Sequence, residues 1–251
     1  MTLSVDLSGT VALVTGASSG FGEHFATVLA AAGAEVVAAA RRTDRLAALT
    51  GRIAAAGGRA RAVALDVTDG ASVTAAIEAI GPVDILVNNA GSTRNGPLLD
   101  LGEEDWDAVL DTNLKGVWLV ANAVARGMRD CGSGGSIVNI ASITALRQSP
   151  GITPYAVSKA GVIQLTKQMA LEWARYRIRV NAIAPGYVLT DINRAWFDTE
   201  GGAAMVKRIP QRRLGALDDL SGPLLLLASD ASAYMTGSVV TVDGGHLLSG
   251  L

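Results

Sequence analysis

Short apolar runs alternate with longer stretches rich in Ala and Leu along the 251-residue chain. Most of the short runs are continuously apolar, which is typical of parallel strands covered on both faces. The longer stretches, such as 22–32 and 46–56, have the length and composition of helices. Seven runs are predicted to be strands: 10–15, 35–40, 60–65, 83–88, 136–140, 179–184 and 239–242.

This alternation predicts an α/β fold, namely a doubly wound, Rossmann-like, seven-stranded parallel sheet with helices on both faces. No change in composition marks a linker, and no internal repeat is present. We therefore expect a single domain over residues 1–251. The irregular segment near 189–210, which carries Trp196 and Phe197, is expected to form a lid over a site within that domain.

Composition and charge exclude several classes of function. Hydrophobic residues make up 49% of the chain, which is typical of a globular protein. The formal net charge is -2, so neither a nucleic-acid-binding nor an anionic-membrane-binding surface is expected. No apolar run approaches the roughly 20 residues of a membrane helix. The lone Cys131 cannot form an internal disulfide, which favours a reducing, cytoplasmic location. His24 and His246 lack metal-ligand spacing, so no metal site is expected.

A glycine-rich turn follows the first predicted strand and opens the first helix, in the sequence Thr15 to Gly22. Gly16, Gly20 and Gly22 let the backbone turn tightly and approach a pyrophosphate. The helix N-terminus then presents free N–H groups to that anion. The spacing is GxxxGxG, and its position at the first strand-to-helix turn indicates a dinucleotide site.

The second predicted strand ends at Ala40, where an acidic residue would bind the ribose 2′-hydroxyl of NAD. Arg41 and Arg42 follow instead, and two guanidinium groups suit the 2′-phosphate of NADP. We therefore expect NADP(H) to be preferred over NAD(H). The alternative is that both arginines only solvate the start of the next helix.

Tyr155 and Lys159 lie four residues apart in a predicted helix that starts after Pro154, so they share one helix face. A neighbouring ammonium favours the phenolate and moves the tyrosine toward the pKa range of a general acid/base. Ser142 follows the fifth predicted strand, where its hydroxyl could hold a substrate oxygen. Asn113 lies within a predicted helix, and a buried asparagine there calls for hydrogen-bond partners.

In their order and spacing these motifs resemble the short-chain dehydrogenase/reductase family over nearly the whole chain, from Gly9 to Gly245. The match also includes an NNAG sequence at 88–91, Pro185-Gly186 with Thr190, and a VDGG sequence at 242–245. The resemblance implies an NAD(P)(H)-dependent oxidoreductase. Such an enzyme transfers a hydride between nicotinamide and a ketone or secondary alcohol, with Tyr155 as general acid/base.

The resemblance also implies residue roles. Ser142 would hold the substrate oxygen, Lys159 would bind the nicotinamide ribose and lower the pKa of Tyr155, and Asn113 would anchor a water that relays protons. The implied cofactor-binding residues are Gly16, Ser18, Ser19, Gly20, Phe21, Gly22, Arg41, Arg42, Asp66, Val67, Asn88, Ala90, Gly91, Tyr155, Lys159, Pro185, Gly186, Val188 and Thr190.

The candidate substrate pocket is mostly apolar, which suits a ketone or a 3-oxoacyl group better than a highly polar sugar. Its expected residues are Ile143, Leu146, Gln148, Ile152, Tyr187, Ile192, Trp196 and Phe197. The alternative for Trp196 and Phe197 is that they only pack within the lid. Where carrier-protein reductases of the family tend to carry basic side chains, this chain has Ser133 and Tyr176, which favours a free small molecule.

The same motifs are compatible with other activities. A 3-oxoacyl-thioester reductase, acting on a carrier protein or coenzyme A, would use the same site. A non-catalytic dinucleotide-binding regulator, or an epimerase or dehydratase on the same fold, is a further alternative. Relatives pair the helices that carry Asn113 and Tyr155 across two-fold axes, so a homotetramer is expected.

Overall fold

The computed structural model describes residues 5–190 and 194–249. These residues form one seven-stranded sheet in the order β3-β2-β1-β4-β5-β6-β7, and every strand pair is parallel. The predicted fold class is thus confirmed. The strands are β1 Val11–Thr15, β2 Glu35–Ala40, β3 Arg59–Ala64, β4 Ile85–Asn88, β5 Gly135–Ile140, β6 Ile178–Pro185 and β7 Val239–Val242.

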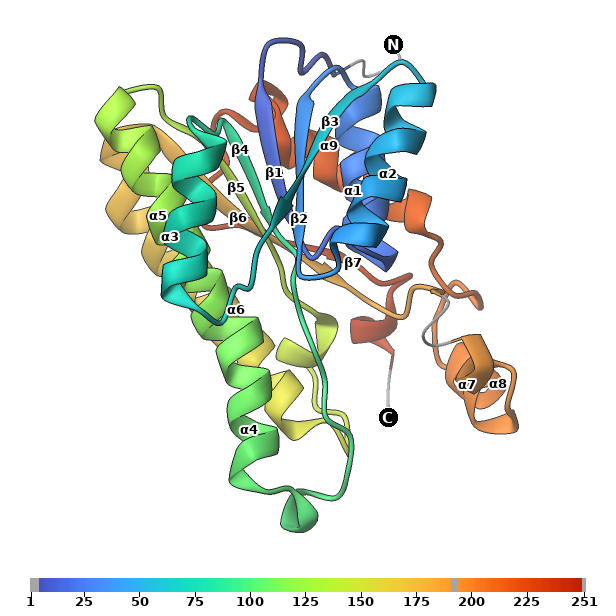
Figure 1. Cartoon of the computed structure of the whole chain (residues 1–251). Helices are drawn as coiled ribbons and strands as arrows, with labels where there is room; N and C mark the ends of the chain where they lie inside the picture. Colours follow the sequence, from blue (N-terminus) through green and yellow to red (C-terminus); the bar gives the residue numbers. More distant parts are fainter. Residues whose placement is uncertain (1–4, 191–193, 250–251) are drawn as a thin grey trace.

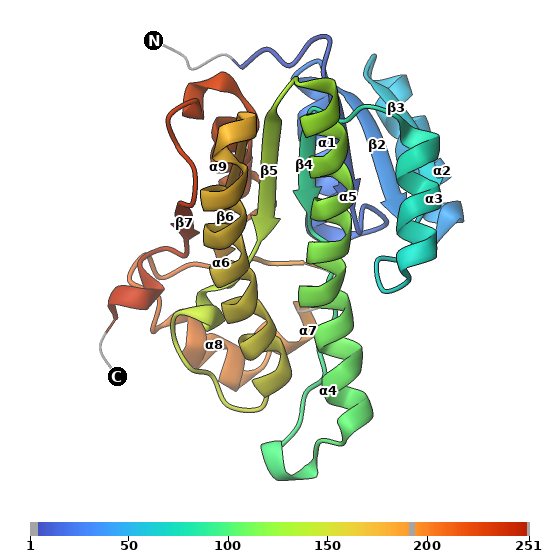
Figure 2. The same ribbon diagram turned by 90° about the vertical axis from the view of Figure 1, so that its left-hand side faces the viewer.

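Helices cover both faces of the sheet, as Figures 1 and 2 show. On one face lie α1 (Gly20–Ala31), α2 (Thr43–Ala55) and α9 (Ser221–Ala228). On the other lie α3 (Gly70–Ile80), α5 (Gly116–Cys131) and α6 (Thr153–Trp173). Short 3-10 turns span Leu98–Asp100, Ile143–Ala145, Ala174–Tyr176, Leu217–Leu220, Asp230–Ser232 and His246–Leu248.

The inner strand β1 is mostly apolar because both of its faces are buried, whereas the edge strand β3 is partly exposed and carries two arginines. Along β1, Ala12 and Val14 pack toward α1, whereas Leu13 packs toward α5 and α3. All three side chains have no exposed surface. Alternate side chains of a strand point to opposite faces, so a strand between two helix layers needs apolar residues at every position.

The carboxyl edge of the sheet is where β1, β4, β5 and β6 end, and the strand order changes direction between β1 and β4. This is the switch point at which open α/β sheets bind their ligands. Three more helices lie beyond this edge: α4 (Glu103–Leu110), α7 (Arg194–Phe197) and α8 (Glu200–Val206). None of the helices in the described ranges is long and apolar enough to cross a membrane.

Candidate active site

The turn between β1 and α1 has the shape of a phosphate cradle. Gly16 and Gly20 have φ angles of +67° and +56°, which side chains rarely tolerate. A Cβ atom on Gly22 would lie 2.4 Å from the carbonyl oxygen of Gly16, so the turn closes only around a glycine. Ser19 caps α1 without a side-chain hydrogen bond, which leaves the first N–H groups of the helix for a ligand.

The end of β4 holds this turn in place. The Asn89 side-chain amide donates to the carbonyl oxygens of Thr15 at 3.0 Å and Gly16 at 3.3 Å. The Thr15 hydroxyl accepts the backbone N–H groups of Asn89 at 3.0 Å and Ala90 at 3.1 Å. Neither Asn89 nor Thr15 was among the predicted site residues, although both stand inside the quoted motifs.

Of the two arginines after β2, Arg42 lies beside the phosphate turn and Arg41 lies near Asp66. The guanidinium of Arg42 donates to the hydroxyl oxygens of Ser18, at 2.9 and 3.2 Å, and Ser19, at 2.9 Å. Arg41 is exposed and lies 3.9 Å from a carboxylate oxygen of Asp66. The two cations therefore flank the end of β2, where the adenine ribose of a dinucleotide binds in this fold.

The residues after β3 lie along the same crevice. The Asp66 carboxylate accepts the N–H and hydroxyl of Thr68 at 3.0 and 2.8 Å, and these bonds lower its pKa. Val67 is buried and packs so closely on the start of α5 that a Cβ on Gly116 would lie 2.9 Å from it. Phe21 stands in the first turn of α1 with its ring partly buried.

The side chain of Asn88, a predicted cofactor-binding residue, lies inside the core. Its amide donates to the Asn139 side chain at 3.0 Å and reaches the Val117 carbonyl oxygen at 3.5 Å. Only 2% of Asn88 is exposed. Asn88 therefore ties β4 to β5 and α5, and the chain that follows it lines the crevice.

Asn113 sits in a single π-helical turn, Asp111–Lys115, that joins α4 to α5. Its side chain is fully buried. The amide nitrogen donates to the Ser92 carbonyl oxygen at 2.9 Å and the Ser158 hydroxyl at 3.0 Å, and the amide oxygen accepts the Ser92 N–H at 2.7 Å. Ser158 in turn donates to the Tyr155 carbonyl oxygen at 2.7 Å. Asn113 thus connects the chain after β4 to the helix that carries Tyr155.

Ser142 and Tyr155 meet beyond the end of β5. Ser142 is 7% exposed and caps the short turn Ile143–Ala145, and its hydroxyl oxygen accepts the Thr144 N–H. Tyr155 lies in the first turn of α6, close enough to Ser142 for the serine side chain to lower the pKa of Tyr155. The two residues are thirteen positions apart in the chain and come close together because the turn after β5 packs against α6.

Lys159 lies one helical turn beyond Tyr155, with its Nζ 5.6 Å from the centre of the tyrosine ring. Nζ donates to the Ile140 carbonyl oxygen at 2.7 Å, and burial lowers the pKa of Lys159 to about 8. Burial also raises the pKa of Tyr155, while the Ser142 side chain lowers that pKa and nearby Tyr187 raises it. No lowering of the Tyr155 pKa by Lys159 is found, because desolvation disfavours both the tyrosinate and the protonated lysine.

Aromatic side chains connect the carboxyl edge of the sheet to the segment that carries Trp196 and Phe197. The Tyr187 ring lies 5.8 Å from Phe197 and 5.4 Å from His246, between ring centres. Phe197 is 9% exposed and packs on Trp196, which is 46% exposed. Of the other predicted pocket residues, Ile143 is buried, Ile152 is partly buried, Leu146 and Gln148 are exposed, and Ile192 lies outside the described residues.

The chain after β6 crosses the same edge. A Cβ on Gly186 would lie 2.8 Å from the Cα of Asp243, so this glycine allows the two segments to touch. Val188 is buried and pairs with Gly215, and the Thr190 carbonyl oxygen accepts the Arg194 N–H at 3.1 Å. A cavity of about 340 Å³ lies between Tyr187 and Val188 and the segments 211–219 and 241–245.

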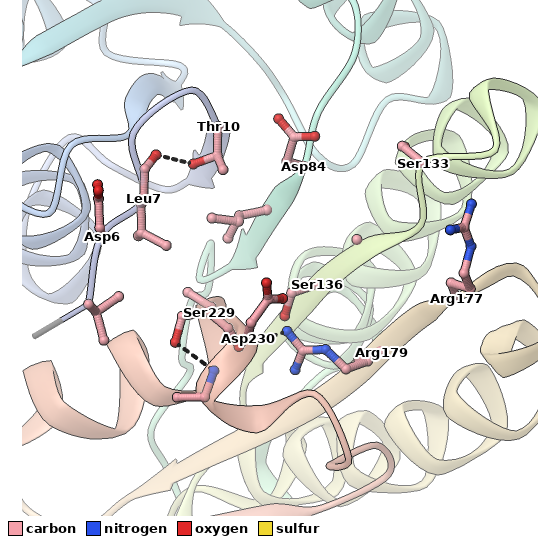
Figure 3. Close-up of a pocket in the computed structure, with 15 residues that line it drawn as sticks. Asp6, Leu7, Thr10, Asp84, Ser133, Ser136, Arg177, Arg179, Ser229 and Asp230 are labelled. Atoms are coloured by element: carbon pink, nitrogen blue, oxygen red, sulfur yellow. Dashed lines mark hydrogen bonds between the residues drawn. The ribbon is translucent and has the colours of Figure 1, made fainter. Parts of the chain in front are cut away.

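A second cavity, of about 440 Å³, lies at the opposite, amino edge of the sheet (Figure 3). Its charged groups serve the fold: Arg179 donates to carbonyl oxygens of Leu227, Ser229 and Ser232 at 3.1–3.2 Å, and Asp84 accepts the Val11 N–H at 2.8 Å. Within residues 5–190 and 194–249 no group of three metal-ligating side chains is found. Cys131 is exposed and not in a disulfide.

The groups at the carboxyl edge fit a nicotinamide dinucleotide. The glycine turn leaves room for a pyrophosphate and no room for a Cβ on Gly22. Among the described residues, the Ser92 hydroxyl is buried without a hydrogen-bond partner. Lys159 uses one of its three donors on Ile140. Gly91 brings the backbone close to that ammonium, since a Cβ there would lie 3.7 Å from Nζ. Ribose hydroxyls would satisfy these groups.

Comparison with known proteins supports this assignment. Residues 16–246 match the family model described as enoyl-(acyl carrier protein) reductase. The chain is 42% identical to gluconate 5-dehydrogenase of Gluconobacter oxydans, covering 97% of this chain and 96% of that protein. It is 41% identical to the 3-oxoacyl-acyl-carrier-protein reductase FabG of Thermotoga maritima, covering 96% and 99%. A gluconate 5-dehydrogenase of Burkholderia cenocepacia, solved with NADP and tartrate, superposes with a TM-score of 0.93 at 42% identity, covering 98% of each chain.

The fold, the site and these relatives together identify the class of protein. It is an oxidoreductase that uses NAD(P)(H) to transfer a hydride between nicotinamide and an alcohol or ketone. The family model and these relatives extend over nearly the whole length of the chain. The chain therefore belongs to the short-chain dehydrogenase/reductase family.

Proposed function

We propose that this protein reduces a small ketone, or oxidises the matching secondary alcohol, with Tyr155 as the proton donor and acceptor. The observation that carries the proposal is the convergence of three side chains at one point of the carboxyl edge. Tyr155 lies near Ser142, whose side chain lowers the pKa of the tyrosine, and Lys159 lies beside the tyrosine ring. All three adjoin the crevice that fits the cofactor.

Bound nicotinamide would supply or accept the hydride, and the protein's own residues would handle the oxygen and the proton. The Ser142 and Tyr155 hydroxyls would both donate to the substrate oxygen, which stabilises the negative charge that develops there during reduction. Tyr155 would then give its proton to that oxygen. An ordinary tyrosine is protonated at neutral pH, and burial, which raises the pKa of Tyr155, keeps it in this form, so it has a proton to give.

We propose NADP(H) as the preferred cofactor. Arg41 and Arg42 flank the end of β2, and a 2′-phosphate placed there would meet two guanidinium groups. The Arg42 guanidinium already bridges Ser18 and Ser19 at the phosphate turn. The NADP bound to the Burkholderia relative is consistent with this preference.

The proposed substrate is a free small molecule with a secondary hydroxyl or a keto group. Tyr187, Phe197 and Ile143 offer an apolar wall beside the catalytic hydroxyls. Gluconate, as the substrate named for two relatives, belongs in the first assays despite its polarity. The second candidate is a 3-oxoacyl thioester on a carrier protein or coenzyme A, favoured by the equally long match to FabG of Thermotoga maritima.

We further propose one NAD(P)-binding domain over residues 1–251, with the segment near 189–210 as a lid. The packing of Phe197 on Tyr187 supports the lid, because it couples α7 to the pocket wall. A cytoplasmic location is proposed on the single, unpaired Cys131.

A homotetramer is proposed because two separate surfaces expose large apolar side chains. Trp118 on α5 is 45% exposed, and Leu171 on α6 is 77% exposed. These two helices lie side by side in Figure 2. On the edge near β7, Tyr234 and Leu248 are fully or largely exposed. Dihedral symmetry requires two distinct two-fold interfaces of this kind.

The test is a panel of gluconate, aliphatic secondary alcohols and ketones, and 3-oxoacyl thioesters, followed by nicotinamide absorbance with each cofactor. Tyr155→Phe should lower kcat by about 10²–10⁴-fold while leaving cofactor affinity nearly unchanged. Near-normal turnover by Tyr155→Phe would refute the proposed role. A kcat/KM that is a hundredfold higher for a carrier-bound thioester than for a simple ketone, with a ratio that decreases as the salt concentration rises, would favour the second candidate.

A further inference from the structure

A pair of hydroxyl groups lies just beyond β5, at the point where the substrate oxygen is expected. The Ser142 oxygen accepts two hydrogen bonds from one residue, Thr144: the backbone N–H donates at 3.2 Å and the side-chain hydroxyl donates at 2.9 Å. We infer that Thr144 is a positioning residue that fixes the direction of the Ser142 proton toward the reacting oxygen. This inference rests on the proposed roles of Ser142 and Tyr155.

The bonding capacity of the Ser142 hydroxyl limits where its proton can point. A serine oxygen has two acceptor lone pairs and a single proton, and that proton otherwise rotates to suit its surroundings. Both hydrogen bonds that the Ser142 oxygen accepts come from Thr144. A hydroxyl that accepts the Thr144 proton keeps its own proton for another acceptor, and Tyr155 is the neighbouring group whose pKa Ser142 lowers. We therefore expect the Ser142 proton to point to the tyrosine side, where the substrate oxygen would bind.

A donor that already points at the developing charge stabilises the transition state without reorganising. A serine whose proton can rotate spends part of its time bonded elsewhere and loses some of that advantage. The same orientation stabilises the Tyr155 phenolate, since a hydrogen bond to the charged form favours it. Thr144 should therefore influence both the rate of proton transfer and the pKa of Tyr155.

The side chain of Thr144, rather than its backbone, makes the arrangement particular to this chain. The N–H bond belongs to the 3-10 turn that Ser142 caps, and any residue except proline could supply it. The hydroxyl bond needs Ser or Thr at position 144. Valine has the shape of threonine without the hydroxyl, so Thr144→Val removes one acceptor bond of Ser142 and leaves the packing almost unchanged.

The experiment compares Thr144→Val, Thr144→Ser, Ser142→Ala and the double variant Thr144→Val/Ser142→Ala with the wild type. The substrate is the secondary alcohol with the highest kcat/KM in the panel above. Thr144→Val should lower kcat roughly five- to tenfold, as expected for one lost hydroxyl hydrogen bond, with KM for the cofactor unchanged. Thr144→Ser should restore most of the rate. Thr74→Val is the matched control, because the Thr74 hydroxyl bonds only a backbone carbonyl on α3.

Two readouts separate positioning from a structural role. In the Ser142→Ala background Thr144→Val should change kcat by less than about twofold, because no serine proton remains to be oriented. An ultraviolet difference titration of tyrosinate, with Tyr155→Phe as reference, should show a higher Tyr155 pKa in Thr144→Val than in the wild type. This second readout requires no substrate.

Several results would overturn the inference. Equal losses from Thr144→Val with and without Ser142 would assign Thr144 a purely structural role. A normal rate and an unmoved tyrosine titration would remove its role entirely. If Thr144→Val fails to fold by circular dichroism, Thr144→Ala is tested in the same cycle. If Tyr155→Phe and Ser142→Ala themselves keep near-normal turnover, the proposed function fails, whereas a failure confined to Thr144 leaves that function intact.

Discussion

Lys159 should make the protein less stable than a neutral residue would, because its charge is buried. Burial lowers the pKa of Lys159 from 10.5 to about 8. Since one pKa unit corresponds to about 1.4 kcal/mol, the protonated side chain destabilises the folded chain by about 3 kcal/mol. Lys159→Met removes the charge and keeps the length of the side chain. It also removes the bond to the Ile140 carbonyl, at a cost of about 1–2 kcal/mol.

The pH dependence separates these two contributions. Below about pH 8, Lys159 is protonated in both states, and the folded chain carries the whole penalty. Between about pH 8 and 10.5, the folded chain has released the proton while the unfolded chain still binds it. The stability of the wild type therefore rises with pH in this window, whereas that of Lys159→Met has no such contribution. The advantage of the variant should shrink by about 2 kcal/mol between pH 7 and pH 9.5.

The assay is urea unfolding followed by circular dichroism, at constant protein concentration and at both pH values. Lys159→Met should be the more stable protein at pH 7 by about 1–2 kcal/mol and should lack catalytic activity. Lys167→Met is the control, because Lys167 is exposed on the same helix and should change stability by less than about 0.5 kcal/mol. A stability difference between Lys159→Met and wild type that is the same at both pH values would refute the reasoning.

Three further predictions concern cofactor binding and assembly. Arg42→Ala should lower kcat/KM with NADPH by about 10–100-fold and hardly change it with NADH, whereas Arg45→Ala should affect neither; equal losses with both cofactors would contradict a phosphate contact. Gly22→Ala should abolish cofactor binding measured by calorimetry, because its Cβ would meet the Gly16 carbonyl at 2.4 Å. The control is Gly51→Ala in α2, where a Cβ would have no atom within 4 Å; this variant should bind the cofactor normally and gain about 0.5–1 kcal/mol of stability. Normal cofactor binding by Gly22→Ala would contradict the steric explanation. Light scattering at micromolar concentration should give four times the mass of one chain, and a monomeric mass would rule out the tetramer.

The sequence alone determined the elements of the sheet and the edge at which the site lies. The predicted strands 35–40 and 239–242 coincide with β2 and β7, and the other five agree to within two residues at either end. This agreement arises because a parallel strand buried on both faces must be apolar at every position. The start of α1 at Gly20, two residues before the predicted helix, reflects the phosphate turn merging into the helix.

The sequence also placed Tyr155 and Lys159 on one helix face, since four residues make about one helical turn. It did not indicate what surrounds them. Burial raises the pKa of Tyr155 and lowers that of Lys159, whereas the spacing alone suggested that Lys159 would lower the pKa of Tyr155. Desolvation depends on every chain segment that excludes water from a group, and these segments are distant in sequence.

The tertiary structure alone decided the partners of the polar side chains. Asn88 lies in a sequence motif of the cofactor crevice, yet its amide meets Asn139, a residue 51 positions later, inside the core. The side chain of Asn113 meets Ser158 where the π-helical turn Asp111–Lys115 packs against α6. Periodicity along one chain reports which face of an element is buried, because backbone geometry sets it. The identity of a hydrogen-bond partner depends on the register between elements, which forms only when the sheet and its helices pack together.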